Sequence, residues 1–212
     1  MVVYDIPTNT ITINVDTKFT FSRLIPGTDK LFVTTHNYKL QLYDISSALP
    51  VKDSSFSDIL DFIREVVVNP VATIPRFYVL TADTIKTYSL STWTLISTKT
   101  KAQLAVDIGG GAAVISIDDI SGMKANIGVL AVLTWTVTGS TYDACILLLD
   151  EQTLAKQRSI LISSNSQFSL ITTSDAFVAN TDLIFIFKPN SGFCFSYKAG
   201  DPSLVAKTSI NM

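Results

Sequence analysis

A single histidine, His36, is the first residue of this chain that could carry acid–base or metal chemistry near neutral pH. A catalytic triad or a zinc site needs further ligands or a nucleophile next to the imidazole. The sequence contains neither a second histidine nor a Gly-x-Ser-x-Gly motif. We interpret His36 as an exposed polar turn residue that is available to a partner, and we predict no catalytic residue and no metal site.

Two pairs of adjacent carboxylates are the next candidates, Asp118–Asp119 and Asp150–Glu151. Neighbouring side chains of a strand point to opposite faces, so neither pair forms an acid–base couple by itself. Neither pair has the spacing of a calcium-binding loop. We therefore predict that both pairs are solvated turn residues.

Three glycines follow Asp107-Ile108, at positions 109–111, where a turn after a strand could cradle a phosphate. A phosphate-binding loop also needs a following Gly-Lys-Ser/Thr and a helix. Neither is expected here, because residues 112–117 have the composition of a strand. We predict a flexible strand connection or a bulge, no cofactor and no small-molecule substrate.

Charge is scarce in this chain of 212 residues. Charged residues make up 16% of the sequence, compared with about 25% in ordinary soluble domains, and the formal net charge is −2. The densest cationic stretch is Lys99-Thr100-Lys101, which we interpret as a solvated turn. Without a basic stripe there is no electrostatic basis for direct nucleic-acid binding.

The apolar segments are too short to cross a membrane as helices, and no basic segment followed by an apolar one marks a signal peptide. Cys145 and Cys194 lie in strand-like runs and do not form a disulfide framework. We predict buried, reduced thiols and an intracellular, cytoplasmic location.

Apolar and polar residues alternate along many short segments, as expected for half-buried strands. Four hairpins are predicted with turn residues between their strands: 31–34 with 39–43, 76–80 with 85–88, 129–137 with 144–149, and 183–187 with 193–197. The chain is therefore predicted to be all-β.

A short strand ending is repeated along the chain. Each copy closes an alternating run, passes through a polar turn and enters another apolar run, with a period of roughly 40–50 residues that is typical of a repeat array. The copies are Val3-Tyr4-Asp5-Ile6, Leu42-Tyr43-Asp44-Ile45, Thr87-Tyr88-Ser89-Leu90, Leu148-Leu149-Asp150-Glu151 and Ser196-Tyr197-Lys198-Ala199.

These units resemble the blades of a degenerate β-propeller with WD-repeat-like blades. Tyr-Asp stands at Tyr4-Asp5 and Tyr43-Asp44 where a regular repeat has Trp-Asp, and the Gly-His pair that precedes a regular repeat is missing. The resemblance implies about four and a half four-stranded antiparallel blades that form part of a larger ring. A small ring sealed by the N-terminal strands and the last unit is the alternative closure.

The expected organisation is a single propeller-like domain over residues 1–212. It begins with a half-blade and continues through four blades. A helical connector is predicted between the first two blades, because Phe56, Ile59, Leu60 and Ile63 have helical spacing. A surface insertion is expected between Lys101 and Asn126. The predicted bounds are 1–16 for the half-blade, 17–54, 65–101, 102–163 and 167–212 for the blades, and 56–64 for the connector.

The resemblance favours a non-enzymatic module for protein–protein interaction, a subunit or segment of a larger multiprotein complex. A half-blade leaves unpaired backbone groups at an apolar edge, so a protein partner is expected to supply strands that complete the ring. The alternative is a structural subunit of a particle, such as a viral coat or tail component with a jelly roll or another β-sandwich. Partner-binding residues are expected in inter-strand turns, at His36, Asn37, Asp83 and Asn190.

Overall fold

The computed structural model describes most of the chain, with gaps at several turns. The described residues are 2–5, 10–13, 19–35, 37–47, 49–70, 74–109, 116–126, 128–138, 141–162, 176–179, 183–188, 193–198 and 201–209.

The described strands form a series of antiparallel sheets in which consecutive strands pair. The first sheet has two strands, β1 (Val2–Asp5) and β2 (Thr10–Ile13). The second sheet consists of β3 (Phe19–Leu24), β4 (Lys30–Thr35), β5 (Lys39–Asp44) and β6 (Val51–Lys52), and β7 (Ile59–Leu60) also pairs with β5.

Three further sheets have four strands each. One contains β8 (Ile63–Asn69), β9 (Arg76–Thr81), β10 (Thr84–Ser89) and β11 (Leu95–Thr100). The next contains β12 (Ser116–Asn126), β13 (Val129–Thr138), β14 (Thr141–Asp150) and β15 (Lys156–Ile162). The last contains β16 (Ala176–Ala179), β17 (Leu183–Lys188), β18 (Phe193–Lys198) and β19 (Asp201–Ser209).

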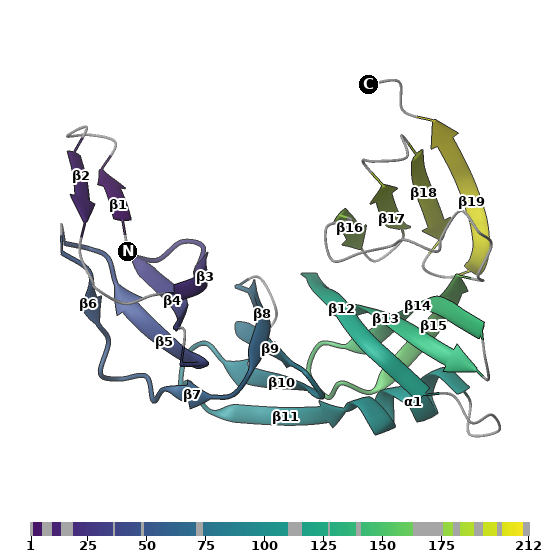
Figure 1. Ribbon diagram of the computed structural model, residues 1–212, viewed down its shortest axis with the longest axis horizontal. Helices are drawn as coiled ribbons and strands as arrows, with labels where there is room; N and C mark the ends of the chain where they lie inside the picture. The colour runs from purple at the N-terminus through teal and green to yellow at the C-terminus, as the bar shows by residue number, and fades with distance from the viewer. Residues whose placement is uncertain are drawn as a thin grey trace.

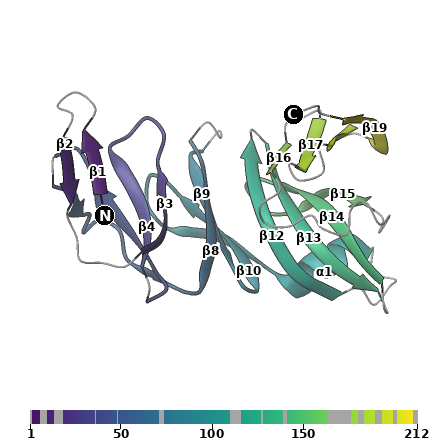
Figure 2. The ribbon, with the colours of Figure 1, turned by 45° about the horizontal axis from the view of Figure 1, so that its top comes forward.

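The larger sheets stand side by side around an open arc, with their first strands on its inner side and their last strands on its outer side (Figure 1). Neighbouring inner strands contact one another, β3 with β8, β8 with β12 and β12 with β16. The β1–β2 sheet and the β16–β19 sheet lie at opposite ends of the arc in both views (Figures 1 and 2). No described pairing joins these two sheets, so the small sealed ring is not formed by the described strands.

This arrangement is a partial propeller, and it confirms the predicted array of four-stranded antiparallel blades. The alternative of a jelly roll or another sandwich is not favoured, because the sheets radiate around an arc and do not stack as two layers.

The cores lie between neighbouring blades, and β9 shows how one strand contributes to two of them. All six of its residues are buried, unlike those of a half-exposed strand. Phe77 and Val79 pack in the core shared by the first two full blades, and Tyr78 and Leu80 pack in the core shared by the second and third. Because successive side chains point to opposite faces, a strand with both faces covered needs apolar residues at adjacent positions.

Backbone hydrogen-bonding groups of the inner strands are partly satisfied by side chains from the next blade. Arg23 donates from Nε to the carbonyl oxygen of Val66 at 3.2 Å. The amide of Met123 donates to Oε2 of Glu65 at 2.8 Å. These contacts hold the inner strands of neighbouring blades in a fixed alignment, because these strands form no backbone ladder with each other.

The predicted helical connector over residues 56–64 is wrong. The segment contains the short strand β7, and β8 begins at Ile63. Its apolar residues do not share one buried stripe, since Phe56 and Ile63 are buried while Leu60 is 70% exposed. Pairing of β7 with the first half of β5 satisfies its backbone in place of helical hydrogen bonds.

The predicted surface insertion between Lys101 and Asn126 is also wrong. The helix α1 (Lys101–Gly109) begins directly after β11, and β12 is the inner strand of the third blade. Leu104 of the helix and Ile120 and Met123 of the strand are fully buried. The helix starts with a capping box, in which the amide of Gln103 donates to Thr100 Oγ1 and the amide of Thr100 donates to Gln103 Oε1.

In the part of the chain that the structure describes, no helix has the length and apolar character that a membrane crossing requires.

Candidate functional site

Two of the four predicted partner-binding residues lie in described turns. Asn37 is exposed in the turn between β4 and β5, and the side chain of Asp83 is 80% exposed in the turn between β9 and β10. His36 and Asn190 lie outside the described residues. The two described turns are equivalent, because each joins the second and third strands of its blade.

Asp61, which follows β7, connects the first of these turns to strand β10 of the second blade. Its amide donates to the carbonyl oxygen of Tyr38 in the first turn at 3.0 Å. Its carboxylate accepts a hydrogen bond from Lys86 Nζ of β10 at 2.7 Å. The segment between the blades therefore holds the first turn against the second blade.

The turn between β9 and β10 has a fixed backbone and an accessible carboxylate. Thr81 Oγ1 accepts hydrogen bonds from the amides of Asp83 and Thr84 at 3.4 and 3.1 Å. The carbonyl oxygen of Asp83 accepts from the amide of Lys101, while its carboxylate lies 3.7 Å from Lys101 Nζ. Such a turn can offer Asp83 as a hydrogen-bond acceptor with little loss of backbone entropy.

The first turn presents an aromatic residue that the sequence analysis did not select. Tyr38 is 52% exposed and its ring lies 4.7 Å, between centroids, from the ring of Phe62, which is also 52% exposed. Tyr38 follows Asn37 in the sequence, but the pairing with Phe62 depends on the position of the β7–β8 connection. Only the tertiary structure brings the two rings together.

A buried polar network joins the second and third blades. The carbonyl oxygen of Glu151 accepts hydrogen bonds from Tyr78 Oη at 3.1 Å and from Arg76 Nη1 at 3.3 Å. The carboxylate of Glu151 accepts from Asn69 Nδ2 at 3.1 Å. Burial raises the pKa of Tyr78 well above its ordinary value, so the phenol remains a proton donor.

The interpretation of Glu151 as a solvated turn residue is wrong, since it is only 3% exposed. The adjacent Asp150 does have the expected role of a turn residue: its Oδ1 accepts from the amides of Gln152 and Thr153 at 2.9 and 2.8 Å. This turn places the Glu151 side chain between the blades. The network is a structural connection between the second and third blades.

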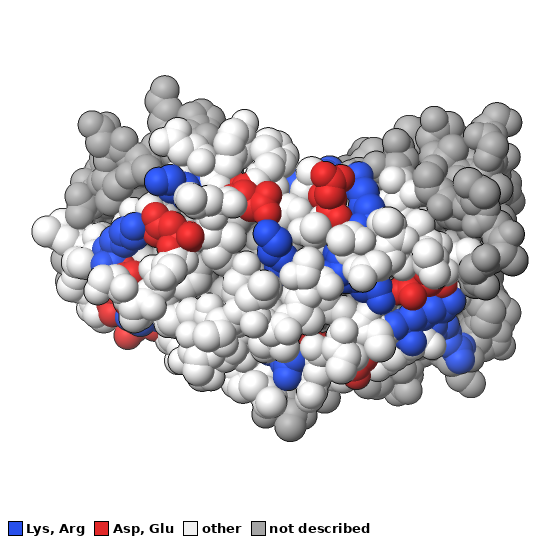
Figure 3. Space-filling model, turned by 90° about the horizontal axis from the view of Figure 1, so that it is seen from below, with Lys and Arg blue, Asp and Glu red and all other residues white. Residues whose placement is uncertain are grey.

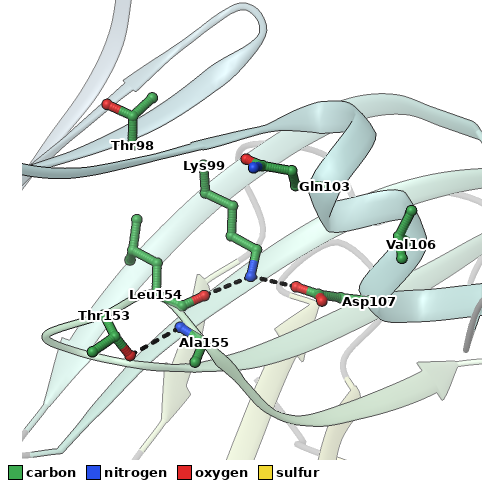
Figure 4. Close-up of a pocket in the computed structure, with 8 residues that line it drawn as sticks. All are labelled: Thr98, Lys99, Gln103, Val106, Asp107, Thr153, Leu154 and Ala155. Carbon is green, nitrogen blue, oxygen red and sulfur yellow. Dashed lines mark hydrogen bonds and ion pairs between the residues drawn. The ribbon is translucent and has the colours of Figure 1, made fainter.

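A surface hollow of about 360 Å³ lies between β11, α1 and the turn from β14 to β15. At its floor Lys99 Nζ donates to the carbonyl oxygen of Leu154 at 2.6 Å and pairs with the Asp107 carboxylate (Figure 4). The side chain of Lys99 is 12% exposed, so its assignment to a solvated turn is wrong. Lys99 and Asp107 pair with each other at the floor of the hollow. The hollow is therefore interpreted as a structural contact between β11 of the second blade and the segments of the third.

Within the described ranges, no group of three histidine, cysteine, aspartate or glutamate side chains is placed to hold a metal ion. Cys145 is fully buried, as predicted, whereas the side chain of Cys194 lies outside the described part of the chain.

On the rim of the array, Lys and Arg side chains lie next to Asp and Glu side chains on a mostly uncharged surface (Figure 3). In the first full blade, Lys30 Nζ lies 2.7 Å from the carboxylates of both Asp44 and Asp53. The hydrogen bond from Lys30, followed by those from Ser55, lowers the pKa of Asp53 from 3.8 to about 2. The pKa of Asp44 is lowered as well, chiefly by Lys30 and then by Ser46.

Lys30→Met is expected to reduce the acid sensitivity of the fold. Because the carboxyl pKa values are lower in the folded than in the unfolded chain, this stabilisation is present above the ordinary value of 3.8 and is lost as the pH falls toward about 2. Urea unfolding at a series of acidic pH values measures how the free energy of unfolding depends on pH. The free energy of unfolding of Lys30→Met should fall less steeply than that of wild type over this range, and Lys30→Arg should behave like wild type. Equal slopes for wild type and Lys30→Met would contradict the assignment.

No protein-family model and no curated protein matches the chain. Solved structures do match. The chain is similar to Hsv2 of Kluyveromyces lactis, with a TM-score of 0.57, 9% identity and coverage of 100% of this chain and 57% of that chain. It is also similar to the β-propeller domain of Cps50 (Swd1) of Myceliophteria thermophila, with a TM-score of 0.58, 11% identity and coverage of 93% and 61%.

At these identities the comparisons show the fold alone: the chain is a β-propeller-like array. A second structure of K. lactis Hsv2 gives the same result, with a TM-score of 0.54, 10% identity and coverage of 98% of this chain and 57% of that chain. The chain thus spans less than two thirds of the length of the solved chains that it matches.

Proposed function

We propose that residues 1–212 act as a non-enzymatic scaffold for protein–protein interaction, in which strands from a protein partner complete the array of blades within a larger complex. The observation that carries this proposal is the open arc, with the two-stranded β1–β2 sheet at one end and the β16–β19 blade at the other. The similarity to propellers that extend well beyond the length of this chain supports it.

The physical reason is the condition of the end strand. Among the described strands β1 pairs only with β2, so its second edge has backbone N–H and C=O groups without a ladder partner. An unpaired edge is a template for another strand, and closed rings protect such edges. Strand addition from a partner would supply these hydrogen bonds.

The equivalent turns between second and third strands would offer the partner-binding residues. Asn37 and Asp83 are exposed there, and we retain His36 and Asn190 as proposed members of the same set. We also propose an intracellular location for this scaffold, in keeping with the buried side chain of Cys145.

Multi-angle light scattering on size-exclusion fractions, at increasing concentration, tests the completion of the array. We expect wild-type residues 1–212 to exceed the monomer mass of 23.1 kDa as the free edges pair with other copies. Val3→Lys, which places a charge on the end strand β1, should shift the mass toward the monomer. Val51→Lys is the matched control, since Val51 is 60% exposed on β6, which belongs to the second sheet and pairs with β5.

Hydrogen–deuterium exchange on the same samples shows whether the backbone amides of the end strands are already protected. The amides of β1 and β2 should exchange faster in dilute wild type than those of β13 and β14, and they should become protected when the ends are covered. A monodisperse monomer with protected β1 amides would mean that the array needs no added strands, and the proposal would fail.

A further inference from the structure

The backbone of Tyr38 has an unusual conformation for an aromatic residue. Its φ is +57°, in the left-handed region that side chains with a Cβ rarely adopt. Two other non-glycine residues of the described chain share this conformation, Trp93 with φ +60° and Leu154 with φ +57°. A strained backbone of this kind persists when surrounding interactions offset its cost.

The compensation comes from burial for two of these residues, and from backbone hydrogen bonds for Tyr38, whose amide donates to Thr35 and whose carbonyl oxygen accepts from Asp61. Leu154 is 1% exposed in the core between the second and third blades. Trp93 is half-buried and packs in the aromatic cluster between the first and second, with edge-on contacts to Phe32 and Phe56. The side chain of Tyr38 instead projects to the surface, where 52% of the residue is exposed. Burial within this chain does not offset the strain at Tyr38.

The exposed ring of Tyr38 belongs to an apolar surface, which we call the Tyr38 patch and define as Tyr38, Leu60 and Phe62. The Tyr38 and Phe62 rings are 4.7 Å apart with an interplanar angle of 38°. Leu60 is 70% exposed and lies opposite Lys39 in the pairing of β5 with β7. Two aromatic rings in tilted contact, with a neighbouring leucine, form an exposed apolar surface, and aromatic residues are enriched in the centres of protein interfaces.

The charges beside the Tyr38 patch are not balanced. Asp61 lies within the patch segment but is paired with Lys86. The carboxylate of Asp58 is engaged by Lys52 and Gln41. Lys39, next to Tyr38, makes no ion pair within the described residues, although it acts on the Asp58 carboxylate at longer range. Three lysines, Lys39, Lys52 and Lys86, thus stand beside two carboxylates, Asp58 and Asp61, which leaves one positive charge in surplus.

We propose that the Tyr38 patch binds a partner peptide segment that places a bulky apolar side chain on the Tyr38–Phe62 ring pair and a carboxylate next to Lys39. This proposal rests on the scaffold function and specifies the chemistry of the partner at the β4–β5 turn. The ring pair supplies apolar area with few rotatable bonds, so little side-chain entropy is lost on binding. The Lys39 ammonium selects an acidic neighbour and disfavours a basic one.

Selection from a displayed library of short random peptides, with wild-type residues 1–212 as the target, tests the proposal. We expect the enriched peptides to share Leu, Ile or Phe close to Asp or Glu. The affinity of synthetic copies, followed by fluorescence anisotropy, should be about tenfold weaker for Tyr38→Asn and for Phe62→Ala than for wild type. Lys39→Gln should weaken binding less and should reduce its dependence on salt.

The variants are chosen so that loss of fold is not mistaken for loss of binding. Asparagine tolerates the left-handed conformation better than tyrosine, so Tyr38→Asn should unfold at the same temperature as wild type or higher. Leu95→Asn is the matched control, because Leu95 is 53% exposed on β11, far along the chain from the patch, and it should bind as wild type does.

Three outcomes overturn the proposal: no peptide enriched above an uncoated surface, enriched peptides that bind Tyr38→Asn as well as wild type, or a wild-type dimer that Tyr38→Asn dissociates. The last would show that a second copy covers the patch. Val3→Lys should leave peptide binding unchanged, and Tyr38→Asn should leave the association of the free edges unchanged. Failure of the peptide site is thereby distinguished from failure of the scaffold proposal.

Discussion

Phe32→Ala should lower the free energy of unfolding by about 3–5 kcal/mol, the usual cost of removing a buried phenylalanine ring. Phe32 is fully buried on β4 and its ring lies 4.7 Å from that of Phe77 on β9. It also contacts Phe56 at 5.6 Å and Trp93 at 6.2 Å, between centroids. The cavity would open in the core that joins two blades, where neither blade can close it alone. Urea unfolding followed by tryptophan fluorescence measures the change.

Phe62→Ala is the matched control, because it removes the same side chain from an exposed position. The Phe62→Ala variant loses only the ring contact with Tyr38, which is worth less than about 1.5 kcal/mol. If the two variants lose similar stability, the core between the first two full blades does not hold them together as described. A loss for Phe32→Ala well below that range would lead to the same conclusion.

Arg76→Met should destabilise the fold by about 1–3 kcal/mol, because it removes the buried hydrogen bond from the guanidinium to the main-chain carbonyl oxygen of Glu151. Arg76 is 2% exposed and Glu151 is 3% exposed, and the guanidinium reaches the main chain of Glu151. The side-chain volume is nearly kept in methionine, so the change acts mainly on charge and hydrogen bonds. Chemical unfolding at neutral pH gives the free energy.

A double-mutant cycle tests whether the side chains of Arg76 and Glu151 are coupled, since both are buried in the same network. We expect Arg76→Met/Glu151→Gln to lose about 0.5–3 kcal/mol less than the sum of the single variants. Lys86→Met, which breaks the partly exposed pair with Asp61, should cost no more than about 1 kcal/mol. Additive losses in the cycle would show that Arg76 and Glu151 are not coupled.

The strands could be predicted from the sequence because their signals are local. Alternation along residues 39–43 gives Leu40 and Leu42 fully buried on one face, and the predicted hairpin is β4–β5. The repeated strand endings gave the correct all-β array of blades, since each unit must hide one apolar face against the next.

The helices were misassigned because spacing alone does not decide which backbone partner is available. Residues 56–64 have helical spacing, but Ile59 and Leu60 pair with β5 as a short strand and Ile63 begins β8. Residues 101–109 were taken as part of an insertion, although Thr100 and Gln103 form a capping box that could have indicated a helix. In both cases the neighbouring blade, and not the local pattern, determined which side chains are buried.

At the candidate site, too, local features could be predicted from the sequence and contacts between distant segments could not. From the sequence came the turns and two of their exposed residues, Asn37 and Asp83, because polar turn residues between apolar runs are a local signal. The ring pair of Tyr38 with Phe62 and the burial of Glu151 depend on segments that lie far apart along the chain. The sequence by itself determined an array of antiparallel blades, since alternation and turn residues act over a few positions. Only the tertiary structure decided which side chains meet between blades and which remain exposed, because those contacts depend on how whole blades pack.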